Sequence, residues 1–152
     1  MRVMMVQIRR VALILAFAML SVGVAQAQAS GAKSPEALGM ALVNAYRSGD
    51  AETIVALHYF VPAAGAAIAE QQIPIRTEWR RLMRRYKLSG YRVTDLSAEE
   101  RQRFNVAAQL SLAPIKKLII NLVAGNGAEQ LSANRYIGSV SGDYFFVTSS
   151  GR

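Results

Sequence analysis

The hydrophobic period of the chain changes once, and this change constrains the fold more than any other feature of the sequence. Between residues 34 and 86, apolar side chains recur every three or four positions, as in amphipathic helices. Between residues 91 and 147 they alternate with polar side chains, as in strands with one buried face. Helices that precede a block of strands favour an α+β fold. We therefore expect N-terminal helices packed on a curved antiparallel sheet of four to five strands.

Capping signals give the expected bounds of the first two helices. The first is predicted over residues 35–48, because Ser34 can cap its start and Gly49 can take the left-handed conformation at its end. Asp50 can cap a second helix that runs as far as Pro62.

Further along, residues 63–70 are alanine-rich and fit either a short helix or a loose connection. Residues 71–75 contain Pro74 and are predicted to be a linker. Thr77 is expected to cap a helix over residues 78–86.

Alternation and turn residues predict the strands of the second half. Clear alternation of apolar and polar residues over 104–112 indicates a strand with one buried face. Gly125-Asn126-Gly127 is predicted to form a hairpin turn, since glycine and asparagine tolerate positive φ. The expected strands cover residues 91–96, 104–112, 115–123, 131–140 and 144–147.

The amino terminus has the three parts of a secretory signal peptide. Three arginines precede an apolar run at residues 11–24, and small residues follow at Ala25 and Ala27. A membrane anchor is the alternative, but the run is shorter than the roughly 20 residues that a spanning helix needs. We expect export, to the periplasm in a Gram-negative cell and otherwise to the medium, with cleavage after Ala27 or Ala29. The predicted organisation is a signal peptide at 1–27, a flexible leader at 28–33, one domain at 34–148 and a tail at 149–152.

Charge and cysteine content narrow the classes of partner. The signal peptide holds three arginines and no acidic residue, so its removal lowers the net charge from +8 to +5. The remaining positive charge favours anionic partners. The export signal and the lack of a recognised binding motif argue against nucleic acid. The chain has no cysteine, which excludes disulfides, a lipid anchor on cysteine and cysteine-ligated metals. We expect no metal and no cofactor.

Two segments carry a family resemblance. The first segment covers residues 34–57 and has a Gly-Asp step between two predicted helices; its sequence is SPEALGMALVNAYRSGDAETIVAL. The second segment covers residues 138–147 and has a Gly-Asp turn before aromatic residues; its sequence is GSVSGDYFFV. Together they resemble the nuclear-transport-factor-two-like superfamily, the cone-shaped cystatin-like fold, which includes ketosteroid isomerase, polyketide cyclases and exported bacterial proteins. The resemblance implies a sheet curved around helices, an apolar pocket and often a homodimer. It implies no reaction, because the fold serves enzymes and binding modules alike.

His58 and three aromatic residues are the candidates for a pocket. His58 is the only histidine, and an imidazole can exchange a proton near neutral pH. Its spacing from Ile54 puts it on an apolar helix face, from which it could point into the cone. Tyr46, Tyr59 and Trp79 are the expected pocket lining. The alternatives are a structural histidine at a helix end and a tryptophan in the core.

A cluster of cations is the second candidate site. Seven basic residues lie between Arg76 and Arg92, and Glu78 is the one acidic residue among them. Guanidinium groups bind phosphate and carboxylate in a bidentate manner. A solvated helix face is the alternative. The candidate anion-binding residues are Arg80, Arg81, Arg84, Arg85 and Lys87.

Three functions follow from these candidates. The sequence favours a non-enzymatic exported binding module for a small apolar ligand or a protein partner, because the predicted interior lacks paired acid and base groups. One alternative is a small isomerase-like or cyclase-like enzyme, with His58 as base and Tyr46 or Tyr59 as hydrogen-bond donor. The other is an envelope adaptor that docks on anionic surfaces through the arginine-rich helix over residues 76–87.

Overall fold

The computed structural model describes residues 30–61, 67–106 and 109–149, so the predicted signal peptide lies outside the described residues. The fold is α+β, as predicted, with helices packed on a five-stranded sheet. The elements in chain order are α1 (Pro35–Ser48), α2 (Ala51–Ala56), β1 (His58–Tyr59), α3 (Ile68–Arg85), β2 (Tyr86–Asp95), α4 (Ala98–Val106), β3 (Lys116–Ala124), β4 (Gln130–Val140) and β5 (Asp143–Val147).

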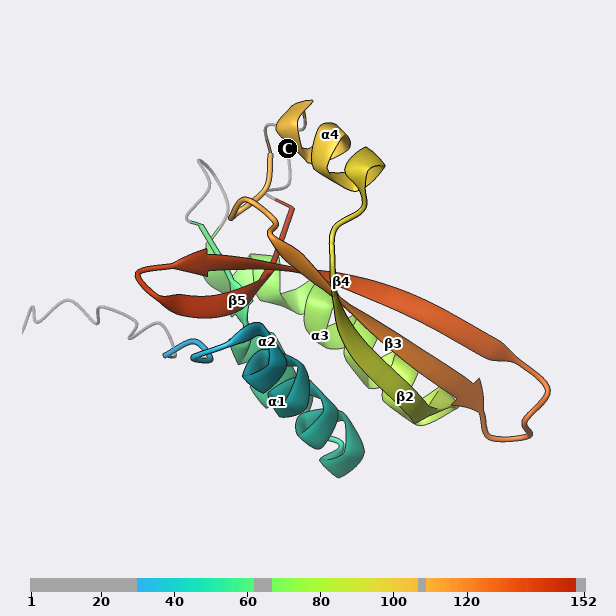
Figure 1. The fold of residues 1–152 in the computed structure, drawn as a ribbon. Coiled ribbons are helices and arrows are strands. Elements are labelled where there is room, and N and C mark those ends of the chain that lie inside the picture. Colours follow the sequence, from blue (N-terminus) through green and yellow to red (C-terminus); the bar gives the residue numbers. More distant parts are fainter. Residues whose placement is uncertain (1–29, 62–66, 107–108, 150–152) are drawn as a thin grey trace, which may run out of the picture.

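The sheet has the strand order β1-β5-β4-β3-β2, with β1 parallel to β5 and all other neighbours antiparallel. Strands β2, β3 and β4 are long and twisted, and α4 lies on the side away from α1 and α2 (Figure 1). Leu118, Ile120 and Leu122 project from one face of β3 and are fully buried against the helices. The alternate residues of β3 face the other side, because successive side chains of a strand point in opposite directions.

Helix α1 begins and ends as its sequence predicts. The Ser34 hydroxyl accepts a hydrogen bond from the Ala37 N–H at 3.0 Å. Gly49 ends the helix with a φ of 74°, a conformation that glycine adopts without steric cost. Leu38 and Leu42 on the buried side of α1 are completely inaccessible to solvent.

Helix α2 is shorter than predicted. Asp50 caps it as expected, with its carboxylate 3.0 Å from the Thr53 N–H. The helix ends at Ala56 and does not reach Pro62, so the predicted helical position of His58 is wrong. Residues 58–59 pair with β5 instead. The main chain turns into the sheet edge because the Leu57 carbonyl accepts the Phe146 N–H at 2.9 Å.

Helix α3 absorbs the predicted linker over residues 71–75. It starts at Ile68, and Thr77 is an interior residue, not a cap. Pro74 cannot donate to the carbonyl of Glu70 four residues earlier. Both residues are exposed, so water can hydrogen-bond to this carbonyl in place of the missing N–H. The helix continues through the proline.

The sequence pattern predicts a helix over residues 78–86 and a strand over 91–96, with a break at Ser89-Gly90 between them, and this break is wrong. Strand β2 starts at Tyr86, directly after α3, and the two residues lie inside it as a bulge in the pairing with β3. A bulge accommodates one extra residue without ending a strand. Lys87 therefore belongs to β2 and not to the arginine-rich helix.

The strand predicted over residues 104–112 is the largest error, because residues 98–106 form α4. Ser97 and Glu100 make the two reciprocal hydrogen bonds of a capping box: the Ser97 hydroxyl accepts the Glu100 N–H at 3.1 Å, and the Glu100 carboxylate accepts the Ser97 N–H at 2.8 Å. Leu110 makes an isolated bridge with Ser149. Local capping thus outweighed the alternating pattern.

The last three strands follow the prediction closely. A two-residue turn joins β4 to β5, with Ser141 at φ 53° and Gly142 at φ 82°. Two positive φ values in succession are typical of the turn that matches the twist of paired strands. Gly127 in the β3–β4 connection also has positive φ, at 73°.

Candidate functional site

A pocket of about 280 Å³ opens between α3 and the edge of the sheet that carries β1 and β5. Phe60, Pro74, Ile75 and Val147 form apolar walls. The polar lining includes His58, Gln71, Glu78, Arg135, Thr148 and Ser149. The volume is just below the range of roughly 300–1,000 Å³ that is usual for ligand pockets.

His58 lines this pocket, although its predicted helix does not reach it. Nδ1 lies 2.8 Å from the Ile54 carbonyl oxygen, and a carbonyl can only accept, so Nδ1 carries the hydrogen. The other nitrogen, Nε2, then has a free lone pair. Burial lowers the pKa of His58 to about 4, the hydrogen bond with Ile54 opposes this shift, and the charge of Arg135 adds to it. The imidazole is therefore neutral at pH 7.

Arg135 and Glu78 form an ion pair in the same pocket. Arg135 Nη2 donates to Glu78 Oε1 at 2.6 Å, and the Arg135 guanidinium lies 4.8 Å from the centre of the Trp79 ring. Trp79 itself is completely buried, and its Nε1 has no hydrogen-bond partner in the described part of the chain. The pocket thus combines a neutral imidazole, a carboxylate and a guanidinium.

Sequence reasoning missed Arg135 and Glu78. Arg135 has the same parity in β4 as the fully buried Ile137, so the strand pattern would have placed a charge on the helix-facing side of the sheet. Glu78 gave no such signal, because its role depends on how α3 packs against β4.

Two of the predicted pocket residues lie in the core. The Tyr46 hydroxyl donates to the Tyr86 carbonyl at 2.8 Å, and burial raises the pKa of Tyr46 to about 12. Its ring packs edge-on against Trp79, with 6.1 Å between the ring centres. These two rings fill the volume where the sequence predicts an apolar pocket.

Tyr59 packs at the edge of the sheet. Its ring centre lies 5.4 Å from that of Phe145, and its carbonyl accepts the Thr148 hydroxyl at 2.8 Å. Within the described ranges, His58 makes no hydrogen bond to either tyrosine. The structure therefore does not bring together the imidazole and the phenol that the enzyme hypothesis pairs.

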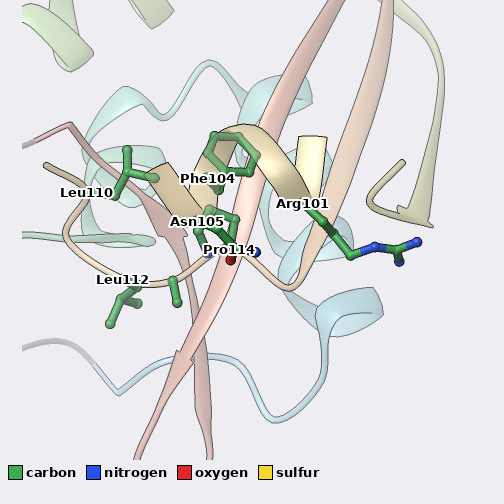
Figure 2. Close-up of a pocket in the computed structure, with 7 residues that line it drawn as sticks. Arg101, Phe104, Asn105, Leu110, Leu112 and Pro114 are labelled. Atoms are coloured by element: carbon green, nitrogen blue, oxygen red, sulfur yellow. The ribbon is translucent and has the colours of Figure 1, made fainter. Parts of the chain in front are cut away.

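A second, more open pocket of about 440 Å³ lies on the outer face of the sheet, under α4. Phe104, Leu110 and Leu112 are among its lining residues, and the guanidinium of Arg101 points away from it (Figure 2). The position of α4 depends on Glu100, whose carboxylate lies 2.9 Å from Lys117 Nζ. This ion pair, the Ser97 N–H and Tyr136 lower the pKa of Glu100 to about 2.

The predicted anion-binding residues are all exposed. Acidic side chains form ion pairs with two of them, Arg80 and Arg85. Glu52 Oε1 accepts from both Arg76 at 2.7 Å and Arg80 at 2.9 Å. Arg85 pairs with Glu129 at 3.1 Å. Arg81, Arg84 and Lys87 form no ion pair with any described residue.

In the described segments, no three His, Asp or Glu side chains are grouped so that they could hold a metal ion. Among the helices of these same segments, none combines the length and hydropathy that a membrane crossing requires. Comparison with known proteins finds no matching family model, no matching curated protein and no matching solved structure.

Proposed function

We propose that the chain is an exported, non-enzymatic binding module that holds a small molecule in the pocket between α3 and β5. The observation that carries this proposal is the neutral His58, which lines a pocket with apolar walls and whose Nε2 has no hydrogen-bond partner among the described residues. A buried hydrogen-bond acceptor without a partner costs free energy. A ligand that donates one hydrogen bond to Nε2 should therefore bind more tightly than one that has no donor.

The lining indicates the chemistry of the ligand. Phe60, Ile75 and Val147 offer an apolar surface, and the volume suits a molecule smaller than a typical drug. The charges of Glu78 and Arg135 are already paired with each other, so the ligand needs no net charge. We infer a small, largely apolar molecule that carries a hydroxyl or N–H group.

The pKa of His58 favours binding over isomerase-like or cyclase-like catalysis. General bases work best when their pKa lies near the operating pH, whereas the pKa of His58 is about 4. The carboxylate in the pocket, Glu78, is engaged with Arg135 at 2.6 Å. No described carboxylate or phenol is hydrogen-bonded to the imidazole to raise its basicity.

We also propose that the domain belongs to the nuclear-transport-factor-two-like superfamily. The support is the order of the elements, in which helices precede the main strands, and a twisted sheet that packs three of its helices on one face (Figure 1).

A matched pair of probes tests the pocket. Cyclohexanol can donate a hydrogen bond to His58 Nε2, whereas cyclohexyl methyl ether has the same apolar ring and no donor. Trp79 is the only tryptophan and contacts Arg135 in the pocket wall, so its fluorescence should report binding of either compound. Amide chemical shifts measured by NMR would locate the binding site.

The variant His58→Asn removes Nε2 but keeps a donor near the position of Nδ1. We expect it to weaken cyclohexanol binding about tenfold, the usual value of one such hydrogen bond, and to leave binding of the ether unchanged. Shifts confined to the second pocket, around Leu112, would contradict the proposal. So would equal weakening of both probes. Mass spectrometry of the chain recovered from its host tests export, with Gln28 or Ser30 expected as the first residue.

A further inference from the structure

The outward side of α3 carries cations that the rest of the described chain only partly neutralises. One carboxylate oxygen of Glu52 serves both Arg76 and Arg80, so it cannot balance the two charges. Arg81 and Arg84 have no ion-pair partner within the described ranges. Both residues are exposed, and no described residue accepts a hydrogen bond from either guanidinium group.

An exposed apolar residue lies on the same side of the helix. Ile73 is 56% exposed, the largest exposed fraction among the large apolar side chains in the described residues. At the helical spacing of about 100° per residue, Ile73 lies in line with Arg80 and Arg84. Trp79 and Leu82 occupy the opposite side, in the core. We call Ile73, Arg80, Arg81 and Arg84 the α3 stripe.

We propose that the α3 stripe docks on an anionic phospholipid bilayer. Guanidinium forks match lipid phosphates, and Ile73 can enter the boundary between headgroups and acyl chains. A soluble polyanion would use the arginines but would leave Ile73 in water, so the exposed isoleucine favours the bilayer. Two acidic residues lie at the edge of this surface: Glu70, one turn before Ile73, and Glu52, which pairs with Arg80.

This inference goes beyond the proposed function, because it assigns a partner to a surface other than the ligand pocket. Ile75 and Glu78 line the pocket. Both residues lie on a different side of α3 from the α3 stripe. A protein with both features would hold its ligand while bound to the membrane surface. Failure of either proposal leaves the other intact.

Sedimentation with vesicles tests the docking. The full-length chain is expressed, recovered as its host processes it, and mixed with vesicles of equal parts phosphatidylglycerol and phosphatidylcholine, or of phosphatidylcholine alone. We expect binding to the anionic vesicles that weakens as salt rises. Each arginine near such a surface strengthens binding about fivefold, so the double variant Arg81→Gln/Arg84→Gln should lower binding about twentyfold or more.

A matched control separates the stripe from net charge. The double variant Arg92→Gln/Arg101→Gln removes the same charge from β2 and α4, and it should bind nearly as well as the parent chain. All variants share one amino terminus, so any contribution of residues 1–29 cancels. An equal loss in the control variant would overturn the proposal, as would equal binding to neutral vesicles.

The variant Ile73→Ser distinguishes a bilayer from another polyanion. We expect it to weaken vesicle binding severalfold, since burial of a large apolar side chain is lost, and to leave binding of inorganic polyphosphate unchanged. If Ile73→Ser has no effect on vesicle binding while polyphosphate competes fully, the stripe is a polyanion site and the lipid proposal is wrong.

Discussion

His58 should make the stability of the protein depend on pH in a way that one substitution removes. Its pKa falls from 6.5 to about 4 on folding, chiefly through burial. The unfolded chain therefore binds a proton at a higher pH than the native chain does. Stability is complete above the unfolded pKa and is lost as the pH falls toward the folded one. The full shift corresponds to about 3 kcal/mol, of which about 2 kcal/mol is lost between pH 7 and pH 4.5.

Urea unfolding followed by Trp79 fluorescence measures this loss, at both pH values and constant ionic strength. The parent chain should lose about 2 kcal/mol more than His58→Asn does over this interval, because carboxylates contribute equally to both. As His58 is the only histidine, its imidazole NMR signals need no assignment by mutation in an untagged chain. They should titrate near pH 4 and report a hydrogen on Nδ1. Equal pH dependence of the two proteins, or titration near 6.5, would refute the reasoning.

Three further substitutions test the fold. Glu100→Gln leaves the mostly buried Lys117 without its carboxylate. It should lower the free energy of unfolding by about 3 kcal/mol and speed hydrogen exchange in α4. Unchanged exchange would show that α4 is held by other contacts. Gly138→Ala would place a methyl carbon 2.6 Å from Leu112 Cβ and should cost about 1–3 kcal/mol in urea unfolding, whereas a neutral result would mean that the segment over β4 moves freely. Gly49→Ala meets no atom within 4 Å but keeps a φ of 74°, so a loss of about 1 kcal/mol in thermal unfolding is expected from backbone strain alone.

Local sequence signals correctly predicted an element when the residues that define its ends lie within a few positions of those ends. Ser34 and Gly49 bound α1 as expected, and the turn at Ser141-Gly142 joins β4 to β5. In these places the hydrogen bonds and φ values that define the boundary lie within the segment itself. The α+β class followed from the same signals, although β1 and α4 were not predicted.

Errors occurred where two local signals competed. The alternation over residues 104–112 predicts a strand, but the capping box of Ser97 and Glu100 starts a helix that covers part of this segment. Pro74 predicts a break in the helix, but the amphipathic pattern on both sides of it favours one continuous helix. This helix places Trp79 in the core. Only the energy of packing against the sheet decides such cases, and this energy depends on residues far away in the sequence.

The candidate site shows the same division. The sequence by itself determined that the chain has one imidazole, an excess of arginine on one helix and no thiol. Tertiary structure decided that β1 carries His58 to the sheet edge and that β4 brings Arg135 to Glu78, 57 residues away along the chain. It also placed Tyr46 and Trp79 in the core, because the two large rings fill the space between helices and sheet that a cavity would need. Residue types limit the chemistry that is available, and long-range packing decides which of these groups meet.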